Sequence, residues 1–363
     1  THDTSSLAFA DIFGTGTAAL VWSRDRIDAA DGHYKALDFC GGVKPYVLIG
    51  MDNSMGMTTR VHYAASTQHF LRDRERGQPW ITALPFPVQV VDKVEVIDHV
   101  GKSKRVCTYQ YHHGHYDGRE REFCGFGRVD QFDSEHFADF AGPGLHGSDL
   151  RFEHDAESHT PVVETRSWFH TGLYVAPGQG IDHRQLTQRF RDEYGRFDDQ
   201  AMPLDDPAVE AGAKAAQAWR ALRGSQLRSE LYAHDGSAQA RYPYQVSEAR
   251  HRVLLLQPAV GQQRAVLFSH AMETLECHYE RNPADPRIEH QLNLQIDAYG
   301  NPLRSLRIAY GRRQQDPGLP TQADRDHQAQ SLLTYTEQRY THPIDDPLAF
   351  PDSHRVPAPC ASS

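Results

Sequence analysis

Residues 88–132 constrain the fold of this chain more than any other stretch. Val88–Ile97 and Lys104–Tyr111 alternate over strand-length runs, and a short loop that carries Gly101 separates them. A period of two residues, bounded by Gly and Asp, is typical of antiparallel strands with one more polar face. The pattern therefore predicts antiparallel β-structure at the centre of a mainly β protein.

Similar runs recur along most of the chain. They are short, rich in β-branched and aromatic residues, and bounded by turn residues, which is the composition of sheet strands. We predict strands at Pro45–Met51, Met57–Tyr63, Val88–Ile97, Lys104–Tyr111, Arg128–Phe132, Pro161–Phe169, Gln226–Ala233, Ala265–Phe268, Thr274–Tyr279, Ile288–Asp297, Pro302–Tyr310 and Ser331–Arg339.

Helix is expected in one or two short segments. Asp206–Gly224 has an Asp that can cap, a Pro suited to the first turn, an Ala-rich interior and a terminal Gly. Ile181–Tyr194 places apolar Leu186, Phe190 and Tyr194 four residues apart on one face.

Glycine positions mark turns and one hinge. Asp297–Asn301 lies between two predicted strands and supplies Gly300 where a positive φ is expected. Asp235-Gly236 predicts a second hairpin turn, and Gly125–Arg128 resembles a glycine hinge within a strand. No strict tandem period is present, so the strands form a degenerate repeat rather than a uniform array.

Composition excludes several classes of protein. The net charge of −10 argues against nucleic-acid binding. The sequence contains no apolar run of bilayer length, so we expect no direct membrane insertion. Five widely spaced cysteines without a CxxC motif predict free thiols rather than a disulfide framework. The 22 histidines could sense pH, but their scatter favours packing roles.

The histidines near residue 113 are the candidates for a metal site. Zinc needs three or four N, S or O ligands in a tetrahedron, and adjacent strand residues point to opposite faces. His113 and His115 could therefore share a metal with Asp117, whereas His112 and His113 could not. Loop packing is the simpler interpretation, so we predict no catalytic residue, no cofactor and no tightly held metal. The aromatic residues of 80–86 and 109–132 favour packing under a sheet over a sugar-binding platform.

Several longer motifs carry a resemblance to a known family. The chain resembles the middle region of the B component of bacterial insecticidal toxin complexes (Tc toxins), the TcdB-like segment, which is related to SpvB-type virulence proteins and to Rhs/YD-repeat shell proteins. The matching motifs are Gly42–Tyr46, Asp52-Asn53, Met55-Gly56, Thr58–Tyr63, Gly77–Trp80, Leu84–Val88, Tyr111–Gly114, Phe123, Gly125–Arg128, Tyr279–Arg287, Asp297–Asn301, Tyr310–Arg312, Thr334–Glu337, Pro343–Asp345 and Cys360.

The resemblance implies a long antiparallel Rhs/YD-type β-sheet strip from a hollow shell. Residues 1–24 are then the end of an FG-GAP-like β-propeller blade, in which Asp11 remains but Phe13 and Ala19 replace the usual Asp residues of a calcium turn. Residues 25–34 form a linker. The first half of the shell segment spans residues 35–200, and the second half, with the predicted helix near 206–223, spans 201–363.

The function that the resemblance implies is structural. The shell would enclose the toxic C-terminal part of the C component before translocation, in an extracellular complex made in the bacterial cytoplasm. The C component would complete the shell, and the pore-forming A component would dock through the propeller. Two alternatives stay open from the residues themselves: a zinc-dependent hydrolase using His113 and His115, and a secreted carbohydrate-binding β protein.

Overall fold

The computed structural model describes residues 7–23, 34–101, 103–133, 161–174, 183–201, 203–210, 215–261, 264–346 and 348–362. The chain divides into two compact units, Thr1–Glu164 and Thr165–Ser363. The boundary that we placed at residue 200 stays a prediction about sequence segments. Among the helices of the described residues, none is long and apolar enough to cross a bilayer. The predicted linker at 25–34 lies outside the described residues, apart from Tyr34.

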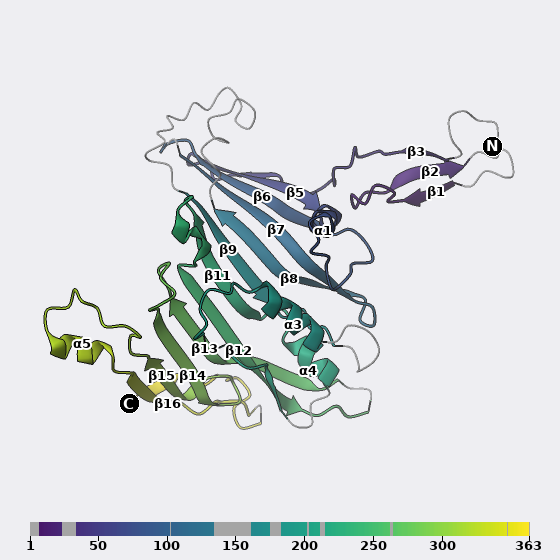
Figure 1. Ribbon diagram of the computed structural model, residues 1–363. Coiled ribbons are helices and arrows are strands. Elements are labelled where there is room, and N and C mark those ends of the chain that lie inside the picture. Colours follow the sequence, from purple (N-terminus) through teal and green to yellow (C-terminus); the bar gives the residue numbers. More distant parts are fainter. Residues whose placement is uncertain are drawn as a thin grey trace. The chain divides into compact units, whose positions relative to one another are not determined.

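The first unit contains two antiparallel sheets (Figure 1). A three-stranded sheet consists of β1 (Leu7–Ala10), β2 (Ala19–Ser23) and β3 (Tyr34–Leu37). A larger sheet follows the chain in order through β4 (Gly50–Asp52), β5 (Met57–Ala65), β6 (Gln89–Asp98), β7 (Ser103–Asp117) and β8 (Glu122–Asp133). Helix α1 (Ser66–Glu75) connects β5 to the strands that follow and packs on β7. Strand β9 (Val162–Phe169) crosses the division between the units.

In the turn between β1 and β2, the Asp11 carboxylate forms hydrogen bonds within the turn itself. The two carboxylate oxygens of Asp11 accept hydrogen bonds from the backbone N–H groups of Thr15 at 3.0 Å and Gly16 at 2.7 Å. The strand, Gly-rich turn and strand that the sequence predicts here are therefore present, and Asp11 closes the turn.

In strand β6 the alternation of buried and exposed side chains shifts by one residue partway along the strand. Val90 is buried, but so are Glu95 and Ile97, which have the opposite parity. The register against β5 shifts between His62 and Tyr63, so that Asp92 is the extra residue of a bulge. The bulge moves the buried face from even to odd positions.

The predicted glycine hinge lies in β8. Gly125 has φ +90°, and the register between β7 and β8 shifts opposite it, between Gly114 and Tyr116. A glycine at positive φ is the usual residue of such a bulge because it lacks a Cβ. The hinge prediction is confirmed, and the bulge also reorients the histidine-bearing end of β7.

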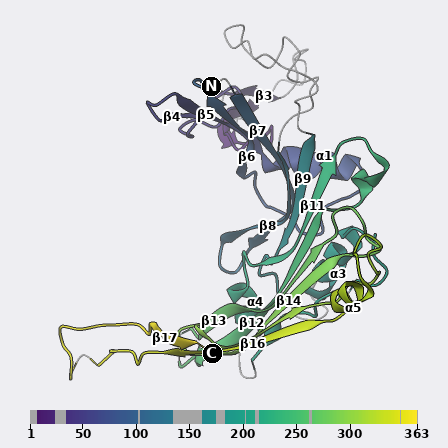
Figure 2. The same cartoon turned by 90° about the vertical axis from the view of Figure 1, so that its left-hand side faces the viewer.

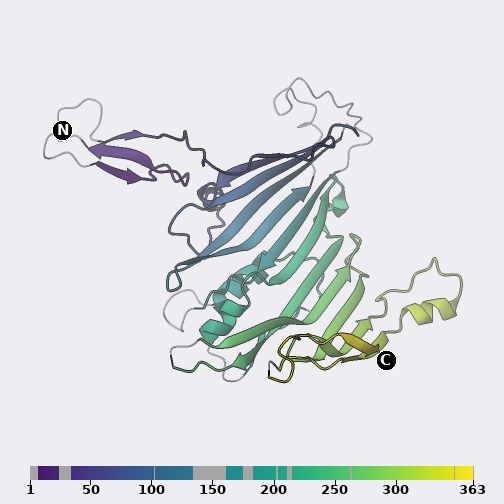
Figure 3. The ribbon, with the colours of Figure 1, turned by 180° about the vertical axis from the view of Figure 1, so that it is seen from behind.

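The second unit is a meander of antiparallel strands (Figures 1 and 2, and from behind in Figure 3). Hydrogen-bonded neighbours follow sequence order from β11 to β17. The strands are β11 (Gln226–His234), β12 (Gln245–Gln257), β13 (Val266–His278), β14 (Arg287–Ile296), β15 (Pro302–Ala309), β16 (Leu332–Tyr340) and β17 (Pro359–Ser362). Short β10 (Ala208–Val209) pairs in parallel with β12, and a 3-10 turn, η2 (Ala238–Arg241), lies between β11 and β12.

The turn between β14 and β15 forms at Asp297–Asn301, as predicted. The Asp297 carboxylate accepts hydrogen bonds from the backbone N–H groups of Tyr299 and Asn301, each at 2.9 Å. Gly300 has φ +85°, and a Cβ there would lie 2.6 Å from the ring of Phe268. Glycine is therefore required twice, by its backbone conformation and by the neighbouring ring.

The two predicted helices lie in the second unit, and one of them is shorter than predicted. Helix α3 (His183–Glu193) confirms the described part of the 181–194 prediction, with Leu186 and Phe190 buried. Helix α4 spans Ala215–Ala221 and does not begin at Asp206. Residues 208–209 form β10 instead, and the Glu210 N–H donates to Val253 O at 3.0 Å, because backbone pairing with β12 outweighs helix propensity.

Most predicted strands are confirmed within a few residues, with three differences. Ala265–Phe268 and Thr274–Tyr279 belong to one continuous strand, β13. Pro45–Met51 is strand only at its end, because Tyr46 has φ +61°, which a strand cannot accommodate. Strands β3, β12 and β17 and helices α1 and α5 (Gln322–Gln328) were not predicted. All five cysteines are free thiols, as expected.

Candidate functional site

The predicted metal ligands lie along strand β7 and its turn. His113 is buried, has φ +55°, and accepts a hydrogen bond at Nδ1 from the backbone N–H of Ile81 at 3.2 Å. His115 is half-buried two residues further on. The Asp117 carboxylate accepts the backbone N–H groups of Arg119 at 2.9 Å and Glu120 at 3.2 Å, which closes the turn to β8.

These three side chains are not brought together as a ligand set. Among the described residues, no group of three or more His, Cys, Asp or Glu side chains is placed to hold a metal ion. Gly114 explains the packing here, since a Cβ at this position would lie 2.7 Å from Leu84 and 2.9 Å from Trp80. The strand therefore packs closely against the loop at residues 80–84. The hydrogen bond from the Ile81 N–H to His113 also holds that loop.

Aromatic side chains fill the space beside this loop. Trp80 is buried, with its ring centroid 5.5 Å from that of Phe70 and 5.9 Å from that of Phe126, both edge to face. Phe126 also lies 4.8 Å from Tyr111. Edge-to-face contacts of this kind are typical of aromatic packing in a core, so these rings act as sheet packing here.

His112 is the centre of a side-chain network that the sequence did not predict. Its Nδ1 lies 2.6 Å from Asp73 Oδ2, and its Nε2 lies 3.2 Å from Asp130 Oδ2. Helix α1 supplies Asp73 and strand β8 supplies Asp130, and both carboxylates are buried. Burial would lower the pKa of His112, but the two carboxylates outweigh burial and raise it.

Both carboxylates of this network have further donors. Asp73 accepts hydrogen bonds from Trp80 Nε1 at 2.7 Å and from the Arg72 guanidinium at 2.9–3.0 Å. Asp130 forms a two-point ion pair with Arg128, both contacts at 2.7 Å. Burial would raise the pKa of each acid, but hydrogen bonding to His112 and the neighbouring arginine charge lower both to about 2.

This carboxylate–histidine network is suited to holding structure rather than to catalysis. Both ring nitrogens of His112 face buried carboxylates that Arg72, Trp80 and Arg128 also hold, so the imidazole is committed to these contacts. The network joins α1 to β7 and β8, so its chemistry is that of a buried ionic clamp. The alternation of one strand could not predict this network, because Asp73 is 39 residues away from His112 in the sequence.

A second buried ionic network ties a loop to the sheet of the second unit. Glu230 on β11 is fully buried and accepts Arg228 Nε at 2.7 Å, Tyr232 Oη at 2.8 Å and the backbone N–H of Gly195 at 3.0 Å. Arg228 also pairs with Glu248 on β12. The backbone N–H groups of Gly195 and Leu204 are thereby bonded to Glu230 on β11 and Glu248 on β12.

His170 is buried in the second unit without such partners. It is 6% exposed, and its Nε2 has no hydrogen-bond partner. Its ring lies 5.8 Å from Trp219 on α4 and 6.0 Å from His251 on β12. Burial, together with the repulsion of His251, lowers the pKa of His170 to about 3, so this side chain stays neutral.

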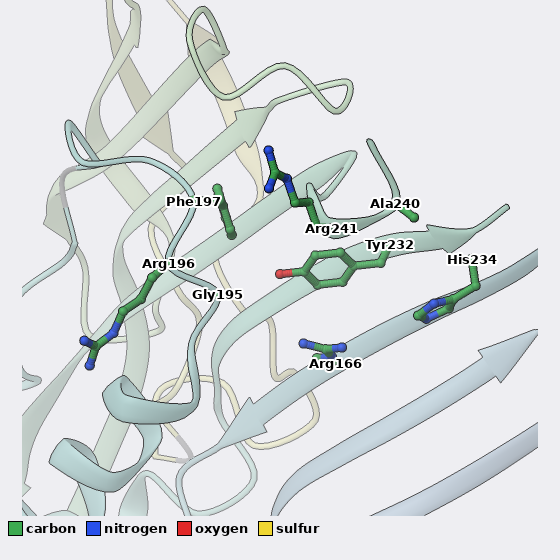
Figure 4. A pocket seen from close by; sticks show the side chains of 8 residues that line it. All are labelled: Arg166, Gly195, Arg196, Phe197, Tyr232, His234, Ala240 and Arg241. Atoms are coloured by element: carbon green, nitrogen blue, oxygen red, sulfur yellow. The ribbon is translucent and has the colours of Figure 1, made fainter. Parts of the chain in front are cut away.

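Beside the Glu230 network lies a hollow of about 400 Å³ (Figure 4). Its lining contains three arginines, one histidine and two aromatic rings, and comprises Arg166, Gly195, Arg196, Phe197, Tyr232, His234, Ala240 and Arg241. No residue of this lining is acidic. The hollow is the clearest candidate for a binding site in the second unit.

Comparison with known families identifies both parts of the chain. Residues 1–142 match the family described as "Insecticide toxin TcdB middle/N-terminal region". Residues 217–350 match the family described as "Insecticide toxin TcdB middle/C-terminal region". Among curated proteins, none matches the chain.

Solved structures of toxin complexes share the fold. A crystal structure of TcdB2-TccC3 is 30% identical over 98% of this chain and 17% of that chain, with a TM-score of 0.78. A crystal structure of TcdB2-TccC3-Cdc42 is 30% identical over 100% of this chain and 17% of that chain, with a TM-score of 0.79. The Photorhabdus luminescens Tc holotoxin pore is 30% identical over 98% and 16%, with a TM-score of 0.77.

The chain thus spans 16–17% of the length of the solved chains that it matches. The two family matches and the structural likeness over nearly every residue agree in their assignment. The chain belongs to the family of the insecticide toxin TcdB, of which it represents the middle region.

Proposed function

We propose that this chain is a wall segment of a toxin shell that encloses the toxic C-terminal part of a C component before translocation. The observation that carries the proposal is the structural match to TcdB2-TccC3 over 98% of the chain at 30% identity. The role is structural, without catalytic turnover. The complex would act outside the cell after its synthesis in the bacterial cytoplasm.

The design of the sheet supports a wall. In each unit the antiparallel strands follow sequence order, so each turn adds one strand and extends the surface. Buried ionic groups are used to hold α1 and the 195–204 loop, as at His112 and Glu230. A cargo container needs an extended surface held by such contacts more than it needs an open catalytic cleft.

Partners follow from the same comparison. The solved relatives are complexes named TcdB2-TccC3, so we propose a TccC-like C component as the chain that completes the shell. We also propose that the pore-forming A component docks through a propeller, of which residues 1–24 are the end of one blade and residues 25–34 the linker. The three-stranded sheet of β1, β2 and β3 is consistent with a blade end.

Co-expression tests this function directly. The polypeptide carrying this chain is produced with a candidate C component, and the purified complex is imaged by electron microscopy and treated with protease. We expect a hollow particle in which the C-terminal part of the C component resists cleavage. A stable complex in which that part is cleaved as fast as in the free C component would overturn the proposal.

A matched pair of glycine variants sharpens this test. Gly300→Val forces a side chain into Phe268 at a positive φ, whereas a Cβ at Gly118 meets nothing within 4 Å. We expect Gly300→Val to lower the yield of particles and Gly118→Val to leave it unchanged. Equal yields would show that the meander turn does not support the wall.

A further inference from the structure

The turn between β1 and β2 is held by side chains from outside the three-stranded sheet, which we call the small sheet. Helix α1, strand β6 and the segment between β3 and β4 each supply one donor to three consecutive carbonyl groups of the turn. The hydrogen bonds run from Thr67 Oγ1 to Gly14 O, from Gln89 Nε2 to Thr15 O and, at 3.5 Å, from Lys44 Nζ to Gly16 O. All these residues belong to the first unit.

The direction of these carbonyl groups follows from Asp11. Its carboxylate accepts the N–H groups of Thr15 and Gly16. The same two peptide units carry Gly14 O and Thr15 O, the carbonyl groups that face α1 and β6. In a planar trans peptide the N–H and C=O groups point in opposite directions. By binding both N–H groups, Asp11 therefore turns the two carbonyl groups away from itself and toward their donors.

Glycine is required where the turn meets β6. Gly16 has φ +77°, a conformation that favours a residue without a Cβ. A Cβ built there would lie 2.9 Å from Gln89 Nε2, so a larger side chain would displace the donor amide. The sequence at residues 14–16 is thus matched both to its own turn and to the close approach of a side chain from the larger sheet.

The surface that receives the turn is also built in advance. The Ser66 N–H donates to Val88 O at 2.8 Å, and the Val88 N–H donates to Ser66 Oγ at 3.0 Å. Thr67 and Gln89 each follow one member of this pair, so their side chains are held next to each other where α1 begins beside β6. Two preformed halves lose little conformational freedom when they dock.

Helix α1 is held at both of its ends. Thr67 lies in its first turn, and Asp73, near its end, accepts the hydrogen bonds of the buried His112 network. The contact with the small sheet is therefore built on a helix that the buried network already fixes to β7 and β8.

We propose that the turn at residues 14–16 and the side chains of Thr67 and Gln89 form a docking joint that fixes the small sheet to α1 and β6. The small sheet has strands of four or five residues, and its Leu7 and Phe9 side chains are 69% and 71% exposed. So small a sheet needs packing against another element for its stability. The docking joint supplies that attachment.

The docking joint itself rests on contacts within the first unit. Only its consequence rests on the proposed function: if the small sheet ends a propeller blade, the joint fixes the propeller to the wall of the shell. A partner that binds the propeller would then act on the wall through α1 and β6 directly, and not only through the linker.

An engineered disulfide tests the docking. A Cβ built at Gly14 lies 3.7 Å from Thr67 Cβ, within the range of about 3.5–4.5 Å for disulfides. The full chain with Gly14→Cys and Thr67→Cys, in a Cys40→Ser background, is oxidised, and the linked peptides are mapped by mass spectrometry. Gly41→Cys with Thr67→Cys is the control, because Gly41 also has a positive φ, +60°, but a Cβ there meets nothing within 4 Å.

We expect the link between positions 14 and 67 to form at least about tenfold faster than the control link, because docking raises the effective concentration of the two thiols. Equal rates in two folded proteins would refute the docking joint.

A second test leaves the turn unchanged. Thr67→Val with Gln89→Met removes both donors at similar side-chain size, and hydrogen exchange of the peptides covering residues 7–23 is followed by mass spectrometry. We expect exchange about tenfold faster, because two hydrogen bonds that hold the small sheet are lost. Gln188→Met, which removes an exposed hydrogen bond on α3, should change that exchange less than about twofold. Unchanged exchange in the double variant would overturn the proposal, also where Gly14→Cys does not fold.

Both tests use the chain without a C component. Failure of the link and of the exchange effect would therefore remove the docking joint and leave the shell function standing. A link that forms as expected, in a polypeptide that yields no hollow particle with a C component, would confirm the joint and remove the shell function instead.

Discussion

The two units bury a histidine in opposite ways. In the first unit, His112 lies between the carboxylates of Asp73 and Asp130, and its pKa is raised. In the second unit, His170 is surrounded by Trp219 and His251, and its pKa is lowered to about 3. Its surroundings thus favour the charged form of the side chain in one core and the neutral form in the other.

The difference teaches that burial alone does not set the charge of a histidine. Burial lowers the pKa in both places, and two carboxylates within reach reverse the outcome at His112. Since a pKa shift is a statement about stability, the two sites must respond to acid with opposite sign. The predictions below test that contrast, from the largest expected effect to the smallest.

Asp73→Ala should produce the largest effect. It removes the acceptor of His112, Trp80 and Arg72 from a buried network. Removing one partner of a buried ionic network costs about 3–5 kcal/mol. Urea unfolding followed by circular dichroism measures the change. Asp92→Ala is the control, because Asp92 is half-exposed and 3.8 Å from His69, and should cost less than about 1 kcal/mol. Comparable losses in the two variants would contradict a buried clamp.

Acidification should destabilise the core around His170. The folded pKa is about 3 and the ordinary value is 6.5, so the unfolded state binds the additional proton between these values. Stability contributed by the neutral His170 is therefore complete above about pH 6.5 and is lost as the pH falls. For one such group the free energy of unfolding falls by up to about 1.4 kcal/mol per pH unit. This amounts to about 1–2 kcal/mol between pH 6.5 and 5.

His170→Phe tests the source of that loss. Phenylalanine keeps a ring beside Trp219 but takes up no proton, so stability measured between about pH 6.5 and 5 should decline less steeply. Part of the decline should remain, because burial and the charge of His270 also lower the pKa of His251. His354→Phe is the control, since His354 is exposed. A slope identical to that of the original protein would exclude His170 as the acid-sensitive group.

Asp130→Asn should convert His112 toward the behaviour of His170. The amide keeps the shape but removes one of the two charges that hold the proton on the imidazole. We expect the pKa of His112 to fall by about one unit or more, measured by NMR titration of the ring protons. The contribution of His112 to stability, now present below pH 6.5 and lost as the pH rises through its raised pKa, should shrink accordingly. An unchanged titration would mean that Asp73 alone sets the charge of His112.

The secondary structure could be predicted where local pattern and tertiary pairing agree. The alternation of Val88–Ile97 predicted β6 but not its bulge, and Asp297–Asn301 formed its turn from its own side chains. Strand β12 escaped prediction because its first half carries charged residues without strand alternation, and its register shifts at Arg250. Helix α5 did have a signal, a capping box between Thr321 and Asp324.

The site could not be predicted from the histidine run itself. The spacing of His113, His115 and Asp117 suggested shared ligands, but His113 bonds to Ile81 and Asp117 closes its own turn. The partners of His112 come from a helix and another strand. Contacts between distant segments depend on register and packing, which alternation within one strand does not specify.

His62→Gln should have the smallest effect and isolates the role of burial. His62 Nε2 lies 3.2 Å from Glu95, so it too has a carboxylate partner, but its side chain is 47% exposed. Water screens that pair, and Glu95 keeps Lys104 at 2.7 Å as a buried partner. We therefore expect a loss below about 0.5 kcal/mol in the free energy of unfolding. A loss above about 1 kcal/mol in urea unfolding would show that a carboxylate neighbour is sufficient without burial, and the contrast between His112 and His170 would then need a different cause.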